Sequence, residues 1–279
     1  MRNTPVISGL ALAALSAAML VAPASGQQAP QAKQSPLQAA CNTAPGAPAG
    51  PAPVASVPRG TAANIAAALQ NKARPAGDIC QDSLRKPADM LAFAGVGPNT
   101  TVAEWIPGGG YFTRIFSKAV SAGGHLYVLA ATTNANLQGI AADANYGGKV
   151  TIVAGTLTSI KPPVPVDVVW TSRNYHDLPV ATRTALNKSS FDMLKPGGIY
   201  IVLDHSALVG SGDYAVAQRP SLHRIDENFV KLEVMQSGFK YVGESNVLRN
   251  ADDNRTGGVM DSSIRGDTDQ FVLKFQKPR

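Results

Sequence analysis

The sequence predicts an α/β domain in which helices cover both faces of a mostly parallel sheet. Three observations support this fold class. Strand-like and helix-like segments alternate from about residue 60 to the C-terminus, a pattern typical of parallel sheets with helical crossovers. A strand, a turn of three glycines and a helix follow one another at 101–120. The last two strand-like segments are joined by the polar loop 249–269, which indicates an antiparallel hairpin at one edge of the sheet.

The elements follow from the hydrophobic pattern and from the turn residues between segments. Two helix-prone segments at 61–73 and 86–95 form a helical preamble before the first strand. Asp226 is placed to cap the last helix and Gly238 to end it, whereas Lys-Pro-Gly-Gly at 195–198 ends the helix before. Apolar runs predict strands at 101–106, 125–130, 150–154, 166–171, 198–204, 240–248 and 270–276, with helices at 111–120, 180–194 and 226–237.

The first 26 residues have the features of a cleaved secretory signal peptide. Arg2 supplies a positive start, an apolar run covers 6–22, and small residues follow at Ala22-Pro23-Ala24. The alternative is a retained membrane anchor, but the run is short for a membrane span and rich in Ala rather than Leu. We therefore expect a periplasmic or secreted protein without a stable membrane span.

Residues 27–59 predict a disordered linker, because a segment rich in Ala, Pro and Gln without aromatic residues buries too little apolar surface to offset its ordering entropy. The folded domain is then expected at 60–279. Cys41 lies in the linker and Cys80 in the domain. In an oxidising compartment they can pair with each other or with other molecules, and the sequence leaves both alternatives open.

Composition excludes several classes of protein. Two cysteines are too few for a disulfide scaffold and lack the paired spacing of a structural zinc site. The net charge of +6 is spread along the chain without a run of five or more basic residues, which argues against a nucleic-acid-binding stripe. We therefore expect a small-molecule ligand and no nucleic acid.

The glycine turn after the first strand is the most informative single feature. Glu104 lies in that strand, and Gly108, Gly109 and Gly110 precede a helix that begins at Tyr111. Doubly wound folds bind ligands at the carboxyl edge of the sheet, where glycines let a ligand approach the main chain closely. Alone this signal is weak, because a glycine-rich connection can be simple turn chemistry. No Gly-Lys-Ser/Thr follows, which excludes an ATPase-type phosphate loop.

Five stretches, the first of which contains the glycine turn, stand in a distinctive order: VAEWIPGGGYFTR, VDVVWTSRNYHDL, FDMLKPGGIYIVLDHSA, LHRIDENFVKLEVMQSGF and TDQFVLKFQKP. Together they resemble the class I S-adenosylmethionine-dependent methyltransferase-like proteins and, more narrowly, the exported bacterial "predicted methyltransferase" group. The resemblance covers about residues 60–279. It implies a Rossmann-like, doubly wound seven-stranded sheet with a reversed terminal hairpin. It also implies S-adenosylmethionine as cofactor, bound over Glu104 and the glycines 108–110.

Two positions depart from the common pattern of that family. Ile106 stands where the first of three alternate glycines is expected, so that a side chain enters this approach to the turn. The second strand ends in Ala130-Ala131, where an acidic residue is expected to hold the ribose hydroxyls. The nearest polar substitutes are Thr132, Asn134 and Asn136, and neutral acceptors bind hydroxyls less strongly than a carboxylate does. We therefore expect weakened or altered donor binding, with Asn134 as the cofactor contact.

Polar residues gather where the fourth and fifth strands end. His176 and His205 are candidate general bases, because a neutral imidazole titrates near working pH. Asp177 or Asp204 can orient an imidazole and contact the substrate. His125 opens a strand at the opposite edge of the sheet, and we assign it a structural role.

Further substrate contacts are expected at the same edge. The resemblance implies substrate-facing or donor-facing polar groups at Asn174 and Tyr175. His223 adds a third histidine before the last helix, and Arg224 suits an anionic substrate group. These positions also have structural alternatives: Arg224 can pair with Asp204 or Asp226, and Asp226 is better placed as a helix cap than as a catalytic group.

The leading hypothesis is methyl transfer from S-adenosylmethionine to a small acceptor that the sequence does not identify. Positioning supplies most of the acceleration in such a reaction, with a base only where the nucleophile loses a proton. The rival is a non-catalytic exported module that binds a ligand or a protein on the same fold. A hydrolase using a metal held by His176, His205 and an aspartate is a third possibility. It lacks an i,i+4 histidine pair, so we expect no metal.

Overall fold

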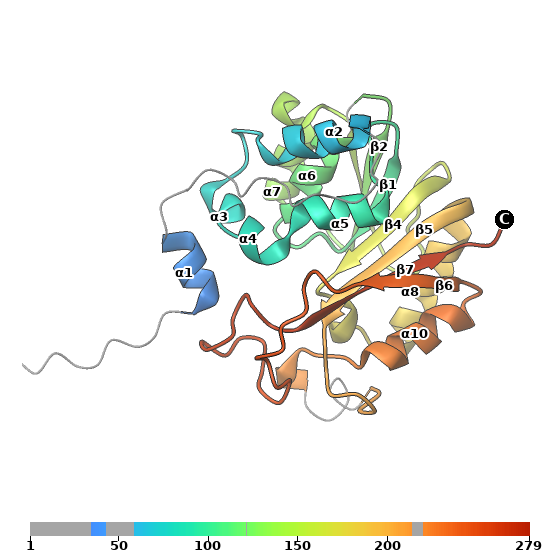
Figure 1. Ribbon diagram of the computed structural model, residues 1–279. Coiled ribbons are helices and arrows are strands. Elements are labelled where there is room, and N and C mark those ends of the chain that lie inside the picture. The colour runs from blue at the N-terminus through green and yellow to red at the C-terminus, as the bar shows by residue number, and fades with distance from the viewer. Residues whose placement is uncertain (1–34, 43–58, 121, 214–219) are drawn as a thin grey trace, which may run out of the picture. The chain divides into compact units, whose positions relative to one another are not determined.

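A seven-stranded mixed sheet forms the centre of the structure, a computed structural model that describes residues 35–42, 59–120, 122–213 and 220–279 (Figure 1). The predicted signal peptide at 1–26 lies outside these residues. The strand order is β3-β2-β1-β4-β5-β7-β6, parallel from β3 to β5, with β7 antiparallel to both β5 and β6. This confirms the expected doubly wound sheet with a terminal hairpin. The strands are β1 (Thr101–Trp105), β2 (His125–Ala130), β3 (Val150–Ala154), β4 (Val166–Ser172), β5 (Leu194–His205), β6 (Lys240–Ser245) and β7 (Gln270–Gln276).

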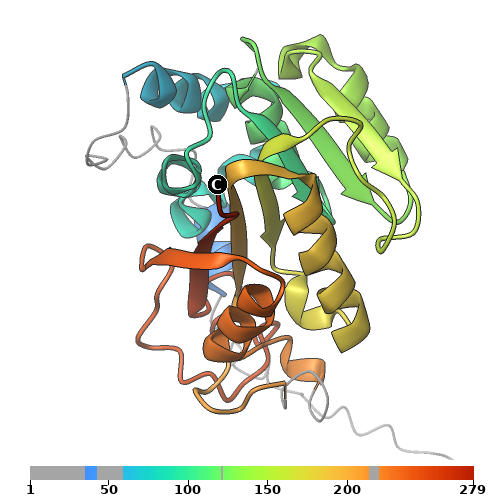
Figure 2. The same ribbon diagram turned by 90° about the vertical axis from the view of Figure 1, so that its right-hand side faces the viewer.

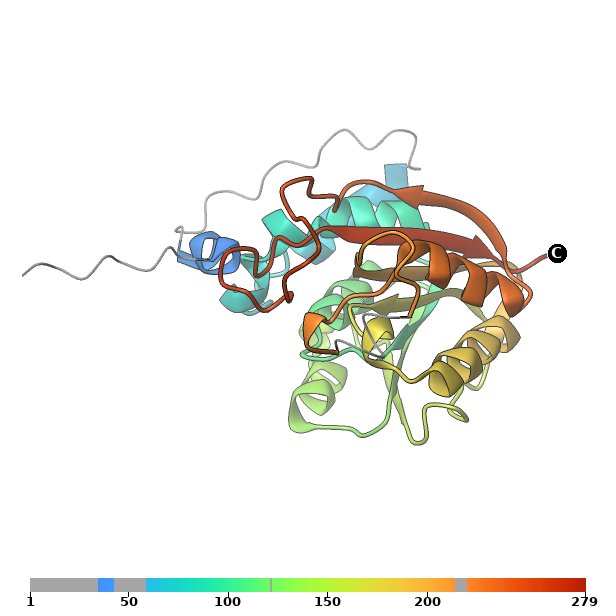
Figure 3. The ribbon, with the colours of Figure 1, turned by 90° about the horizontal axis from the view of Figure 1, so that it is seen from below.

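Helices cover both faces of the sheet (Figures 2 and 3). Side chains alternate along each central strand, so that Val102 contributes to one core cluster and Ala103 to the other. Helices α2, α5, α6 and α7 pack on the first cluster, whereas α8 and α10 pack on the second. None of the described helices is both long and apolar enough to cross a membrane. The helices are α1 (Pro36–Asn42), α2 (Arg59–Leu69), α3 (Ala76–Ile79), α4 (Asp82–Arg85), α5 (Pro87–Ala94), α6 (Tyr111–Ala119), α7 (Ala135–Ala142), α8 (Val180–Met193) and α10 (Glu227–Gln236), with 3-10 turns η1 (Ala144–Tyr146), η2 (Tyr175–Asp177) and η3 (Pro220–Leu222).

Most predicted elements are present, and three differences have clear causes. Strands β2, β3 and β7 have the predicted bounds. Strand β5 begins at Leu194, because residues 195–198 form a bulge in its pairing with β4 rather than a separate turn. Helix α7 was not predicted: it buries only Leu137 and Ile140, a weak hydrophobic pattern. The predicted helical preamble is present, and it includes the short helices α3 and α4 besides α2 and α5.

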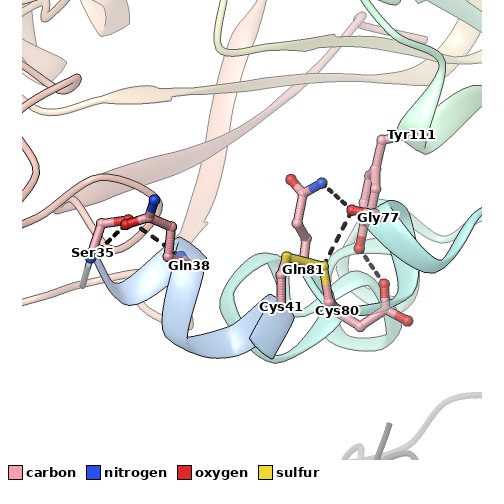
Figure 4. The surroundings of a disulfide bond; sticks show 8 residues. Ser35, Gln38, Cys41, Gly77, Cys80, Gln81 and Tyr111 are labelled. Atoms are coloured by element: carbon pink, nitrogen blue, oxygen red, sulfur yellow. Dashed lines mark hydrogen bonds between the residues drawn. A yellow bond between two sulfur atoms is a disulfide. The ribbon is translucent and has the colours of Figure 1, made fainter. Parts of the chain in front are cut away.

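The third difference concerns the predicted linker. Residues 36–42 form helix α1, so disorder does not extend through this part of the chain. Ser35 and Gln38 form a reciprocal capping box, in which the Gln38 amide donates to Ser35 Oγ and the Ser35 amide donates to Gln38 Oε1 (Figure 4). A disulfide joins Cys41 to Cys80 beside α3, and the Leu37 amide donates to the Arg265 carbonyl at 3.0 Å. The helix is therefore fastened to the domain at two points.

Candidate functional site

The carboxyl ends of β1, β4 and β5 bring the predicted site residues to one edge of the sheet. These strands are parallel neighbours, so the loops that follow them leave the sheet on the same side. The glycine turn follows β1, residues 173–178 follow β4, and His205 ends β5. His125 lies at the opposite edge with Nε2 against Thr151 Oγ1, in agreement with its structural assignment.

The turn after β1 keeps the backbone path of a glycine-rich loop although it begins with isoleucine. Ile106 has a φ of 50°, Gly108 of 57° and Gly110 of 83°, all in the left-handed region. This conformation is costly for a β-branched residue. The Ile106 side chain packs against the second core cluster. A Cβ added at Gly108 or Gly109 would meet no heavy atom within 4 Å, whereas one at Gly110 would meet Ile140 at 2.6 Å. Space is therefore open beside the first two glycines.

The side chains of Arg114 and Asn136 stabilise this turn by hydrogen bonds. Arg114 Nη1 donates to the Gly109 carbonyl at 3.0 Å and to Asp78 in α3 at 2.9 Å. Asn136 Nδ2 donates to the same carbonyl at 2.8 Å, and its Oδ1 accepts from Arg114 Nη2. Asn134, the expected cofactor contact, caps α7 by accepting from the Leu137 amide at 3.0 Å. The Asn134 Oδ1 therefore already accepts one hydrogen bond, and the Asn136 amide is engaged by the glycine turn and by Arg114.

Glu104 lies beneath the turn rather than in the open space. Its side chain is buried and accepts from Thr113 Oγ1 at 2.6 Å. Burial raises the pKa of Glu104 to about 7, although the Thr113 hydrogen bond and the charges of Arg85 and Arg114 oppose this rise. Near pH 7, Glu104 is therefore protonated in part of the protein molecules and ionised in the rest.

Asn174 and Tyr175 do not face an open site. Asn174 Nδ2 lies within hydrogen-bonding distance of the Ile106 carbonyl at 3.2 Å, and its Oδ1 accepts from Thr171. Tyr175 is fully buried, with its hydroxyl accepting from Asn187 and donating to Glu233. Asn174 therefore braces the glycine turn, and Tyr175 belongs to the core; neither is the substrate contact that the resemblance implied.

His176 and Asp204 form a buried pair. The Asp204 carboxylate accepts from the His176 ring Nδ1 at 2.6 Å and from the main-chain amides of His176 and His205 at 2.9 and 2.7 Å. Burial lowers the pKa of His176, but the Asp204 charge and hydrogen bond outweigh it, and the net shift is upward. His205 Nδ1 lies 2.7 Å from Thr268 Oγ1, and burial beside Arg173 lowers its pKa well below the ordinary value. The pKa values of the two histidines are therefore shifted in opposite directions.

Asp177 and His223 lie next to the His176 ring. Asp177 Oδ1 is 3.2 Å from His176 Nε2 and 2.8 Å from His223 Nδ1, and the three ligand atoms lie within 4.8 Å of one another. Two imidazoles and a carboxylate suit zinc or iron in ligand type. Among the described residues, the structure thus assembles a metal-compatible group that contains His223, whereas the metal hypothesis considered from the sequence used His205.

Arg224 and Asp226 have structural roles. Arg224 is fully buried and donates to both carboxylate oxygens of Asp253 at 2.9 and 3.1 Å and to two main-chain carbonyls. The expectations of a substrate contact, or of pairing with Asp204 or Asp226, are therefore wrong. Asp226 caps α10 as predicted, accepting from the Asn228 amide. Asp253 was missed because it lies in the polar loop 249–269, remote in sequence from its partner.

Two arginines that the sequence reasoning also missed lie at this edge. Arg85 ends α4, and Arg173 directly follows β4 with a φ of 56°. Together with His205 they line a cavity of about 230 Å³. An arginine immediately after a parallel strand, next to residues already singled out, is the signal that could have pointed to Arg173.

A larger cavity of about 490 Å³ lies away from these residues, between the loop 158–165 and α8. Its charged lining residues include Lys188 and Asp192, which are exposed and pair with each other at 2.7 Å. The loop 158–165 precedes β4, so this cavity lies at the opposite edge of the sheet, where the parallel strands begin. None of the predicted site residues line it.

Solved structures share this fold. A putative methyltransferase from Bacillus halodurans C-125 aligns with a TM-score of 0.51 and 15% identity, over 69% of this chain and 98% of that one. The 1,6-didemethyltoxoflavin-N1-methyltransferase of Burkholderia thailandensis, solved with its substrate and S-adenosylhomocysteine, aligns with a TM-score of 0.52 and 15% identity, over 71% and 80%. The [4+2]-cyclase SpnF aligns with a TM-score of 0.52 and 14% identity, over 73% and 81%.

The chain therefore has the class I methyltransferase fold. Comparison with protein-family models and with curated protein sequences found no match. At these low identities the likeness establishes the fold alone, and a neighbour described as a cyclase shows that this fold serves more than one reaction. Function has to be argued from the residues of the site.

Proposed function

We propose that the protein transfers a methyl group from S-adenosylmethionine to a small acceptor, with His176 as the group that takes the acceptor's proton. The observation that carries this proposal is the His176–Asp204 pair at the carboxyl edge of the sheet. Because Asp204 accepts from Nδ1, the neutral ring presents its lone pair at Nε2. Asp177 lies 3.2 Å from Nε2, so a proton taken up there is stabilised by carboxylates on both sides.

The glycine turn fits the adenosyl donor. Gly108 and Gly109 carry no side chain, and the space that a Cβ would enter is open. Ile106 preserves the left-handed backbone of the missing glycine and packs toward the core. We propose that the main chain at Gly108 and Gly109 holds the donor. Ala130 and Ala131 offer no charged partner for a ribose, which lowers affinity without blocking the site.

The residues of the chain have separate tasks in this reaction. The bound donor supplies an electrophilic methyl group together with its own leaving group. Asn174 and Arg114 hold the turn in place through main-chain carbonyls. His176 accepts a proton from an acceptor hydroxyl or amine, and Asp204 orients its ring and stabilises the resulting cation.

Donor binding is tested by calorimetry with S-adenosylmethionine and S-adenosylhomocysteine. We expect Gly109→Val to abolish binding of both while leaving the melting temperature nearly unchanged, because the added side chain enters open space. Gly139→Val, on the α7 helix and also without a neighbour, is the matched control. Absence of heat and of a thermal shift with either ligand at millimolar concentration would overturn the donor site and favour a non-catalytic binding module.

The base is tested by turnover, measured as S-adenosylhomocysteine formed in the presence of small hydroxyl and amine compounds. We expect His176→Gln to lower turnover by about 100-fold or more while retaining S-adenosylhomocysteine binding. His125→Gln, at the opposite edge of the sheet, is the matched control and should behave like the wild type. Undiminished turnover in His176→Gln, or a large loss of its melting temperature, would contradict the assignment.

We also propose that the protein acts outside the cytoplasm after removal of residues 1–26. The Cys41–Cys80 disulfide supports this, because such bonds persist in oxidising compartments. N-terminal sequencing of the protein from its native source should find a mature chain that begins near Gln27. A chain that retains Met1 would contradict the proposal.

A further inference from the structure

The cavity of about 230 Å³ at the carboxyl edge has a positively charged interior. Its lining includes Arg85, Arg173, Arg265 and His205, and contains no carboxylate. Arg265 is exposed at the rim, whereas the other three side chains lie deeper. Arg85 and Arg173 are partly buried, and positive charges withdrawn from water around one space are unfavourable unless an anion compensates them.

Within the described part of the chain, neither Arg85 nor Arg173 has an anionic partner. Among the described residues, no carboxylate forms an ion pair with Arg85 or Arg173. Arg85 stacks on the Tyr111 ring at 4.0 Å, and Arg173 Nε donates to the amide oxygen of Gln270 at 2.9 Å. Arg85 Nε and Arg173 Nη2 are buried without a hydrogen-bond partner. The carboxylates whose charge acts on the pair are bonded elsewhere: Asp82 to Arg74 and Tyr111, Asp78 to Arg114, Glu104 to Thr113, and Asp204 to His176.

The positive charges of Arg85 and Arg173 repel each other in this arrangement. Burial and, to a smaller extent, the neighbouring charge of Arg85 lower the pKa of Arg173 to about 9. Burial also lowers the pKa of Arg85 and of His205, the latter with the help of both arginines. Arg173 in addition has a left-handed φ of 56°, a backbone conformation that costs free energy in a residue with a side chain. Strain and uncompensated charge at one point are features of sites built for a ligand.

We propose that this cavity binds a carboxylate or phosphate group of the methyl acceptor, so that the acceptor is a small organic anion. The proposal rests on the proposed methyl transfer and names the substrate class for it. A bound anion supplies hydrogen-bond acceptors for Arg85 Nε and Arg173 Nη2 and offsets their mutual repulsion. The planar guanidinium groups suit both carboxylate and phosphate oxygens.

The other residues that line the cavity indicate the chemical character of the rest of the acceptor. Leu37, Leu84, Val259 and Met260 contribute apolar surface around the arginines. Leu37 comes from α1, which the Cys41–Cys80 disulfide and the hydrogen bond to Arg265 fasten over the domain. An anionic head with a short apolar body matches this combination of walls. The cavity is smaller than typical drug-sized sites, which restricts the acceptor to a small metabolite.

The test measures anion binding in the full oxidised protein without donor. Inorganic phosphate and succinate are titrated by calorimetry and by thermal shift, with sodium chloride at equal ionic strength as reference. We expect saturable binding to the wild type and at least tenfold weaker binding to Arg173→Gln and Arg85→Gln. Lys188→Gln removes one exposed charge at the other edge of the sheet and should bind as the wild type does.

Melting temperatures distinguish a binding role of Arg173 from a structural one. Because Arg173 forms no ion pair with a carboxylate of the described residues and its Nη2 is buried without a partner among them, Arg173→Gln should melt at or above the wild-type temperature without anion and lose the anion-dependent rise. A variant that melts lower and keeps the full rise would overturn the proposal, as would equal rises in all variants, which indicate general salting effects.

Binding of two adenosyl compounds shows whether the anionic group in the cavity belongs to the donor or to the acceptor. Methylthioadenosine lacks the amino-acid part of S-adenosylhomocysteine. If Arg173→Gln weakens binding of S-adenosylhomocysteine but not of methylthioadenosine, and phosphate competes with the former, the cavity serves the donor carboxylate and the assignment to the acceptor is refuted. Independent binding of phosphate and S-adenosylhomocysteine supports it. Phosphate binding without any S-adenosylhomocysteine binding would refute the proposed function and the acceptor role while leaving an anion site.

Discussion

The buried carboxyl of Glu104 predicts a pH dependence of folding that one substitution should remove. Its pKa is about 7 in the folded protein, against an ordinary value of 4.5. The folded state therefore binds this proton more tightly than the unfolded state does. Between those two values the native protein holds more protons, so the free energy of unfolding falls as pH rises. A shift of about 2.5 units corresponds to roughly 3 kcal/mol, fully lost above about pH 8.

Glu104→Gln keeps the side-chain volume and an oxygen that can accept from Thr113 Oγ1, but it cannot ionise. We predict that the variant and the wild type have similar free energies of unfolding near pH 4. The variant then becomes more stable than the wild type, by roughly 3 kcal/mol at about pH 8.5. Asp192→Asn, at an exposed carboxylate on α8, is the control and should show no such divergence.

The assay is urea unfolding of the oxidised protein at a series of pH values, followed by tryptophan fluorescence, since Trp105 and Trp170 are both buried. The quantity of interest is the difference between variant and wild type at each pH, in which the contributions of other titrating groups cancel. Parallel stability curves, or a wild type that gains stability over the variant as pH rises, would refute the assignment of a raised pKa to Glu104.

Three further substitutions are predicted to change the free energy of urea unfolding. Cys41→Ser combined with Cys80→Ser should lower it by about 4 kcal/mol, because the disulfide spans a sequence separation of 39 and restricts the unfolded chain; an unchanged midpoint would contradict this. Arg224→Leu should lower it by about 3 to 5 kcal/mol, since it leaves Asp253 buried without its cation, and leucine at both positions should recover much of the loss; a cost below about 1 kcal/mol would argue against a buried pair. Asp226→Ala should cost about 1 to 2 kcal/mol through loss of the α10 cap, with Asp226→Asn milder; equal costs for the two would show that charge rather than capping decides.

Part of the candidate site could be predicted because parallel strands share an edge. The sequence placed His176, Asp204 and His205 at the ends of two strands, and the structure brings them together: Asp204 accepts from the His176 ring and from the His205 main-chain amide. It also offered Asp204 as a residue that orients an imidazole, which is the contact observed. These residues lie within a few positions of strand ends, where the local pattern and the topology suffice.

Other assignments failed where the partner lies far along the chain. Arg224 appeared free for a substrate because Asp253 lies 29 residues away in an irregular loop. Asn174 turned inward to the Ile106 carbonyl, 68 residues away on another strand's loop. The α1 helix was missed although Ser35 and Gln38 form a capping box that is visible in the sequence, because the surrounding composition outweighed that short signal.

The sequence alone determined the alternation of strands and helices, the cap at Asp226 and the glycine turn, because these depend on backbone preferences and on neighbours a few residues apart. The left-handed conformation of Ile106, the disulfide and the meeting of Arg85 with Arg173 were decided only by the tertiary structure. Strand order brings such groups together from loops far apart in the chain, and burial then changes their charge and hydrogen bonding. No local pattern carries that information.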